Sequence, residues 1–248
     1  MGMGSVLFYS VLLVSVLFLF VFLDIFFSCF IVCLCVFCLQ NKGKEIQIMN
    51  LLTQNSKLKK TSKLAGKRVF NFGIPAYKSE SGRLTCPMAA ECVKFCYASK
   101  GAYSWSNVKP AFEKRYQLTK TDQFIGLMNK EIKNKKADYV RVHDSGDYYS
   151  KEYLKKWFQI AKDNPGVRFY SYTNMVKLIK ESDIPSNFDF IFSDSGKQKH
   201  LIKKTDRQTK IFKSEKELND FGFINAMEND LDATKWFNPS NKVGLVYH

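Results

Sequence analysis

The sequence predicts an α/β fold in which a parallel β-sheet curls into a partial (β/α) barrel, with an apolar helix at the N-terminus. Short runs of apolar and β-branched residues alternate along the chain with longer segments of helical periodicity. Strands that alternate with helices in this way form βαβ units, and therefore a parallel sheet. With 248 residues and a hydrophobic content of 46%, the chain is long enough to bury one such core.

The elements of this fold are expected from about Gly66 onward. Strands are predicted at residues 67–74, 138–143, 167–173, 188–193, 210–213 and 242–247. Helices are predicted at residues 108–119, 122–134, 150–162, 174–181 and 215–220, and Ser150 can cap the third of them. Residues 75–106 are expected to form a long loop, because they contain proline, glycine and three cysteines but no sustained period.

Residues 1–40 differ sharply from the rest, because Asp24 is the only charge between residues 5 and 39. A membrane-spanning helix needs about 20 apolar residues, so segment 5–39 is expected to cross a bilayer once. The basic segment 41–65 is expected to be a linker, and the positive-inside rule then keeps residues 66–248 in the cytoplasm, tethered to the membrane. In the alternative interpretation Met49 is the true start, the upstream residues are a misread frame, and the protein is soluble and cytoplasmic.

The net charge of +15 lies entirely after residue 48, since Lys42 and Lys44 cancel Asp24 and Glu45. Such a surplus indicates an anionic partner, such as a nucleic acid, a nucleotide or a lipid surface. The competing interpretation is that these lysines cover solvated helix faces. The three tryptophans are expected in the core or at its rim, and not as platforms for stacking: Trp105, Trp157 and Trp236.

The seven cysteines fall into two groups. Four are expected to be structural residues of the apolar segment: Cys29, Cys33, Cys35 and Cys38. Cys86, Cys92 and Cys96 form an odd set in the polar region, which argues against a disulfide framework and favours metal ligands. A soft cation or an iron–sulfur cluster neutralises such a set, and three thiolates leave one metal position open for chemistry. The alternative is a closed zinc site with His143 as the fourth ligand.

A second set of chemical groups lies where the predicted strands end. Arg141 and His143 precede the turn Ser145-Gly146-Asp147, and period-2 geometry places these two side chains on the same face of the sheet. The next two strand ends also carry small polar residues: Thr173, Asn174, Ser193 and Ser195. Ligands bind at the carboxyl ends of parallel strands, so the three ends are expected to share one ligand. Taken alone, Ser-Gly-Asp fits an ordinary turn into a helix equally well.

The order of these elements resembles that of radical S-adenosylmethionine enzymes. The shared features are the Cys92-x3-Cys96 loop, the Ser-Gly-Asp turn after a strand and Thr-Asn after the next strand, although the cysteine spacing is longer here than in those enzymes. The resemblance implies a [4Fe–4S] cluster on Cys86, Cys92 and Cys96 that binds S-adenosylmethionine at its open iron. It further implies a set of residues that hold this cofactor: Ser145, Gly146, Asp147, Thr173, Asn174, Ser193 and Ser195.

More closely, residues 49–248 resemble the phage gene product 88 family. The resemblance rests on Asn-Phe-Gly-Ile-Pro-Ala-Tyr at 71–77, Thr-Cys-Pro at 85–87, Phe-Cys-Tyr-Ala at 95–98 and the 141–147 stretch. The first functional hypothesis is therefore a phage-type iron–sulfur protein, a radical S-adenosylmethionine-like enzyme that acts on a nucleic acid or nucleotide. The second is a basic nucleic-acid-binding module with a structural zinc site. The third is a membrane-tethered protein that works through its apolar helix.

Overall fold

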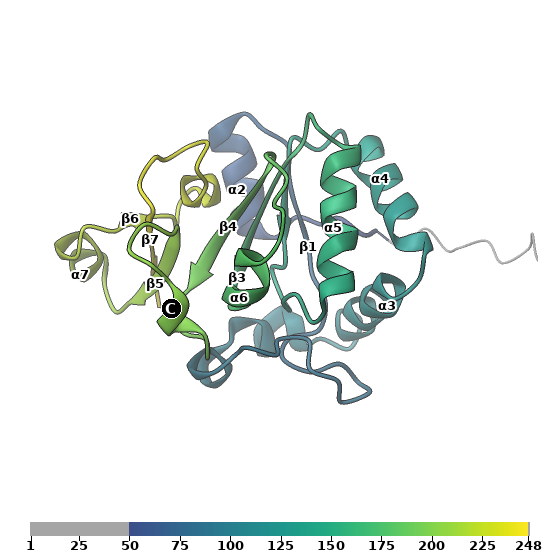
Figure 1. Cartoon of the computed structure of the whole chain (residues 1–248), viewed down its shortest axis with the longest axis horizontal. Coiled ribbons are helices and arrows are strands. Elements are labelled where there is room, and N and C mark those ends of the chain that lie inside the picture. The colour runs from purple at the N-terminus through teal and green to yellow at the C-terminus, as the bar shows by residue number, and fades with distance from the viewer. Residues whose placement is uncertain (1–49, 248) are drawn as a thin grey trace, which may run out of the picture. The chain divides into compact units, whose positions relative to one another are not determined.

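The structure is a computed structural model that describes residues 50–247. Its centre is a sheet of seven parallel strands in the order β1-β2-β3-β4-β5-β7-β6, which curls into a half-barrel (Figure 1). The strands are β1 (Val69–Phe72), β2 (Tyr139–Val142), β3 (Arg168–Thr173), β4 (Phe188–Ser193), β5 (Gln208–Phe212), β6 (Ile224–Asn225) and β7 (Lys242–Val246). The predicted α/β class and parallel sheet are confirmed, and only the two-residue strand β6 had no signal in the sequence.

The helices follow the predicted alternation with the strands. The α-helices are α2 (Ser56–Ala65), α3 (Lys109–Thr119), α4 (Gln123–Lys135), α5 (Lys151–Asp163), α6 (Val176–Lys180) and α7 (Glu215–Asp220). Short 3₁₀ helices are η1 (Glu91–Phe95), η2 (Tyr97–Ser99), η3 (Gly101–Ser104), η4 (Lys199–Leu201) and η5 (Asp230–Ala233). Ser150 caps α5 as predicted, because its hydroxyl accepts a hydrogen bond of 3.2 Å from the backbone N–H of Tyr153.

Two layers cover the two faces of the sheet, and alternate residues of each strand point to opposite faces. Helices α4 and α5 cover the face that we call the α5 face, where the Phe72 ring lies 5.6 Å from Phe124 and 5.2 Å from Trp157. Helix α2 and η5 cover the opposite face, which we call the α2 face. Its apolar core contains Leu58, Val69, Tyr139, Tyr170, Ile191, Leu231 and Val243. Both faces are therefore buried over β1 to β4, as parallel strands require.

Residues 56–65 were expected in a basic linker, but they form helix α2, and the compact unit begins at Asn50. The linker assignment is wrong for this stretch because the helix has few apolar residues, so its periodicity is weak in the sequence. Leu58 is nevertheless fully buried in the core of the α2 face. Asn55 caps the start of the helix by accepting from the Leu58 N–H at 2.9 Å, and Gly66 ends it in a left-handed conformation.

Within residues 50–247, no helix combines the length and apolarity that crossing a bilayer requires. The predicted apolar helix at residues 5–39 lies outside the described residues.

Candidate functional site

The three cysteines lie on a segment, residues 75–108, that runs across the carboxyl ends of the strands. Figure 1 shows it at the lower end of the sheet, toward which the arrow of β4 points. Two backbone contacts hold it there. The Asp147 N–H donates to the Thr85 carbonyl at 2.9 Å, and Ala89 forms an isolated bridge with Gly196. The cysteine segment is thus tied to the loops that follow β2 and β4.

Cys86, Cys92 and Cys96 are free, half-buried thiols that share one environment. Burial raises the pKa of Cys86 above its usual range, and the negative charges of Asp147, Cys96 and Cys92 raise it further. Burial also raises the pKa of Cys96, and the neighbouring Cys92 raises it further. Within residues 50–247, no three His, Cys, Asp or Glu side chains converge closely enough to hold a single metal ion. The thiols are therefore neighbours on one loop, but they do not form a closed single-ion site.

Asp147 is the polar residue that joins these strand ends. Its carboxylate is buried and accepts hydrogen bonds from the Thr173 hydroxyl at 2.6 Å, the Asn174 N–H at 2.9 Å and the Tyr148 N–H at 2.8 Å. Burial raises the pKa of Asp147 to about 6, although the bonds from Thr173 and Asn174 oppose that rise. The predicted convergence of the β2 and β3 ends therefore exists, and Asp147 connects them.

Asn174 extends this contact to the thiols. Its Nδ2 lies 3.9 Å from the Sγ of Cys92, whereas no donor among the described residues reaches its Oδ1. A Cβ on Gly196 would lie 2.3 Å from that same Oδ1, so only glycine permits the β4 loop to pass Asn174. On that loop, the hydroxyls of Ser193 and Ser195 lie 2.8 Å apart and bond to each other.

The Ser145-Gly146 turn requires glycine at position 146 for two reasons, its backbone conformation and the lack of room for a side chain. Gly146 has a φ of 85°, and a Cβ there would lie 2.2 Å from the Ile74 side chain. The buried hydroxyl of Ser145 has no hydrogen-bond partner among the described residues. Ser145 Oγ and Asn174 Oδ1 are thus buried polar atoms left available at the strand ends.

His143 does not join the thiols, and the expectation that it shares a face with Arg141 is wrong. Its φ of 67° lies in the left-handed region, so the chain leaves the period-2 geometry of β2 at this residue. The ring turns to the α5 face, where Nε2 lies 2.9 Å from the Tyr153 hydroxyl and the ring packs edge-on against Tyr148. Burial lowers the pKa of His143 to about 3. It is a neutral core histidine in this structure.

The α2 face carries a buried charged cluster that the sequence did not predict. Asp230 is fully buried and accepts from Lys57 at 2.6 Å, from Tyr170 at 2.6 Å and from Arg141 at 3.2 Å. Burial by itself would raise the pKa of Asp230, but the charges of Arg141 and Lys57 outweigh it and hold the pKa below its usual range. No local pattern marks Asp230, which lies 89 residues from Arg141 in the chain.

The same face holds a second buried carboxylate nearer to the strand ends. Asp144 accepts from Asn71 at 2.6 Å and from the Tyr103 hydroxyl at 3.0 Å, and burial raises its pKa. A Cβ on Gly73 would lie 2.1 Å from Asp144 Oδ1, so glycine makes room for that oxygen. Asp144 Oδ1 and Arg141 Nε have no partner among the described residues. Together they offer an acceptor and a donor inside the half-barrel.

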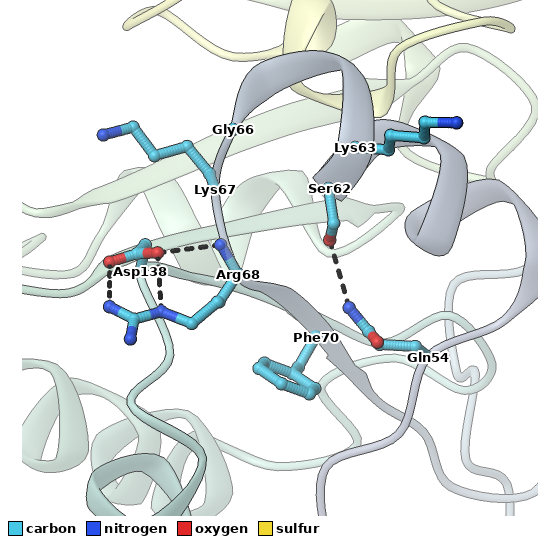
Figure 2. A pocket seen from close by; sticks show the side chains of 8 residues that line it. All are labelled: Gln54, Ser62, Lys63, Gly66, Lys67, Arg68, Phe70 and Asp138. Carbon is cyan, nitrogen blue, oxygen red and sulfur yellow. Dashed lines mark hydrogen bonds and ion pairs between the residues drawn. The ribbon is translucent and has the colours of Figure 1, made fainter.

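A hollow of about 690 Å³ lies at the opposite, amino-terminal edge of the sheet. Figure 2 shows Arg68 turned onto Asp138 there, while the side chains of Lys63 and Lys67 extend in opposite directions. None of the predicted site residues lines this hollow, which is also lined by Gln54, Ser62, Gly66 and Phe70. The chemical groups of interest are at the carboxyl ends.

The part of the chain that matches known proteins coincides with the compact unit that begins at Asn50. The family profile described as gene product 88 matches residues 49–247, a range that includes every described residue. The chain belongs to the gene product 88 family. All residues of the candidate site fall within the matched range. No solved structure matches the chain significantly, so the fold of this gene product 88 protein rests on the structure described above.

Two curated members of the gene product 88 family resemble part of this chain. The Gene 88 protein of Mycobacterium phage L5 is 28% identical over 118 residues, which cover 42% of this chain and 47% of the phage protein. The Gene 88 protein of Mycobacterium phage D29 is 27% identical over 118 residues, with the same coverage. The chain thus spans about half the length of the curated relatives it matches, and their names state no reaction.

Proposed function

We propose that this gene product 88 protein holds an iron–sulfur cluster of the [4Fe–4S] type on Cys86, Cys92 and Cys96. The observation that supports the proposal is the place of these thiols. They are free, they lie on one segment across the carboxyl ends of a parallel half-barrel, and Cys92 lies 3.9 Å from Asn174 of the next strand end. When bound, such a cluster with one position open supplies one-electron chemistry.

The donor chemistry of the three thiols fits both a cluster and zinc, and the position of His143 bears on the choice between them. Three soft sulfur ligands suit either iron–sulfur or zinc. A cluster distributes its cysteines over several irons, so its sulfurs lie farther apart than the ligands of one zinc ion. Residues 50–247 hold no closed single-ion set, and His143, the fourth ligand of the zinc hypothesis, is bonded to Tyr153 on the α5 face. In this structure the zinc hypothesis therefore lacks the fourth ligand that the sequence offered.

We extend the proposal to S-adenosylmethionine as a second cofactor and to a radical S-adenosylmethionine-like enzyme. The loops that follow β2, β3 and β4 each contact the cysteine segment. Two of their buried polar atoms, Ser145 Oγ and Asn174 Oδ1, have no partner among the described residues. The Ser145 hydroxyl can donate or accept a hydrogen bond at the polar end of a small cofactor, and Asn174 Oδ1 can accept one. Asp147 already accepts three hydrogen bonds, so its part is to position Thr173 and Asn174.

The test is to express the full chain anaerobically and to measure iron, sulfide and zinc per protein. Stoichiometric iron and sulfide, with an EPR spectrum of the reduced protein that changes when S-adenosylmethionine is added, would support both parts of the proposal. An unchanged spectrum would remove the cofactor and keep the cluster.

Cysteine variants locate the cluster. Cys92→Ser should abolish most of the bound iron, whereas Cys38→Ser, a matched change in the apolar segment, should leave it intact. Zinc without sulfide would instead support the alternative of a nucleic-acid-binding module with a structural zinc site.

A further inference from the structure

The outer side of the cysteine segment exposes large aromatic rings. Trp105 is 61% exposed and Tyr97 55%, whereas Trp157 is fully buried as expected. The expectation that Trp105 lies in the core or at its rim is therefore wrong. Because burial of an aromatic ring is strongly favourable, two exposed rings on one short segment indicate a surface that contacts another molecule.

The same segment and the residue that follows it carry exposed cations without carboxylate partners among the described residues. They are Lys78, Arg83, Lys94, Lys100 and Lys109, and none of them lies within 4.0 Å of a carboxylate among the described residues. On helix α2, ion pairs neutralise Lys57 and Lys60 with Asp230 and Glu228, whereas Lys59 and Lys63 are exposed and also lack a carboxylate partner among the described residues. Of the acidic residues on the cysteine segment, Glu91 is itself paired with Lys199 at 3.6 Å.

Tyr97 connects this surface to the interior of the half-barrel. Its hydroxyl donates to the Asp144 carbonyl and lies 3.4 Å from Arg141 Nη2, so the ring is anchored at its polar end although the residue is 55% exposed. The Tyr103 ring packs edge-on against it at 5.7 Å. A flat group stacked on Tyr97 would therefore lie at the strand ends, near the thiols and the unpartnered atoms of Arg141 and Asp144.

We propose that this surface binds single-stranded nucleic acid, with bases stacked on Tyr97 and Trp105 and phosphates near Lys94, Lys100 and Lys109. Stacking platforms interleaved with cations are the means by which proteins bind single strands, since the faces of paired bases are hidden in a duplex. The inference rests on the proposed function for the chemistry that follows binding, and it names single-stranded DNA or RNA as the substrate class of that site.

The test measures fluorescence anisotropy of the full-length protein with labelled oligo-dT and oligo-rU of about 12 nucleotides, and with a duplex of equal length. One arm of the comparison, dT against rU, distinguishes DNA from RNA. Single strands should bind more tightly than the duplex, and affinity should fall as salt rises. No binding at about 50 mM salt, or equal binding of the duplex, would overturn the inference.

Two variants assign the binding to this surface. Trp105→Ala should weaken single-strand binding about 10-fold, and Trp105→Phe should restore most of it, because stacking on one ring contributes about 1–3 kcal/mol. Lys100→Gln with Lys109→Gln should reduce the slope of log affinity against log salt by about 1.4.

The matched control is Leu64→Ala on α2, where the side chain is 60% exposed and lies beside Lys63. It should leave the dissociation constant unchanged, and an effect equal to that of Trp105→Ala would refute the assignment. Iron content is measured on every variant. If the wild-type protein contains iron but does not bind oligonucleotides, only this inference is overturned. If it binds oligonucleotides but contains no iron or sulfide, only the proposed cluster is overturned.

Discussion

Acidification should destabilise the protein through His143, whose neutral ring is buried against Tyr148 and Tyr153. Burial lowers the pKa of His143 to about 3 in the folded protein, while an unfolded histidine has a pKa of about 6.5. The contribution of the neutral ring is therefore fully present above pH 6.5. It is lost as the pH falls toward 3, because only the unfolded chain takes up the proton.

The linkage relation gives the size of this effect. Between pH 7 and pH 5, the His143 contribution to the free energy of unfolding should fall by about 2 kcal/mol. Asp147 acts in the opposite direction, because its pKa is raised to about 6 from an unfolded value of about 3.9. Its protonation in the folded state should return about 1 kcal/mol by pH 5, so the wild-type curve alone does not isolate His143.

The measurement is therefore a difference between variants. Asparagine tolerates the φ of 67° at position 143, so His143→Asn should fold and lose only this titration. Urea unfolding followed by tryptophan fluorescence, to which the buried Trp157 contributes, gives the free energy of unfolding of each protein at several pH values. The gap between wild type and His143→Asn should change by about 2 kcal/mol from pH 7 to pH 5, in favour of the variant. A gap that stays constant would refute the reasoning, and the exposed His200→Asn is the matched control.

Three further predictions concern stability. Asp230→Asn should lower the free energy of unfolding by about 3–5 kcal/mol in urea titrations, because it leaves buried cations without their carboxylate; a loss below about 1 kcal/mol would contradict the role of that ion pair. Gly146→Ala should cost about 2–4 kcal/mol by the same assay, since its φ is positive and the new methyl would meet Ile74. Gly222→Ala has the same backbone strain without a neighbour within 4 Å, so an equal cost would rule out the clash. Ser150→Ala should cost about 1 kcal/mol through loss of the α5 cap, and an unchanged melting midpoint would argue against it.

The chain's local chemistry was sufficient to predict most of the fold. Hydrophobic periods, β-branched runs and the Ser150 cap are properties of neighbouring residues, and they located the strands and helices from β1 to β7 apart from β6. Helix α2 was missed because it has few apolar residues: it is held by the buried Leu58, by its caps and by the ion pair of Lys57 with Asp230. Strand order was not predicted: β1 to β5 lie side by side in chain order, as successive βαβ units do, whereas β7 lies between β5 and β6.

The candidate site also has a part that the sequence predicts and a part that only the tertiary structure shows. The sequence by itself determined which groups stand at the strand ends, because Thr173 ends a recognisable strand, while Asp147 and Asn174 follow such strands. Only the tertiary structure decided where other side chains point. His143 itself has a left-handed backbone conformation, which turns its ring away from the thiols. Tyr97 bonds to Asp144, which lies 47 residues further along the chain. Arg141 meets Asp230 across 89 residues. Contacts of that range depend on how the sheet curls, which no short stretch of sequence encodes.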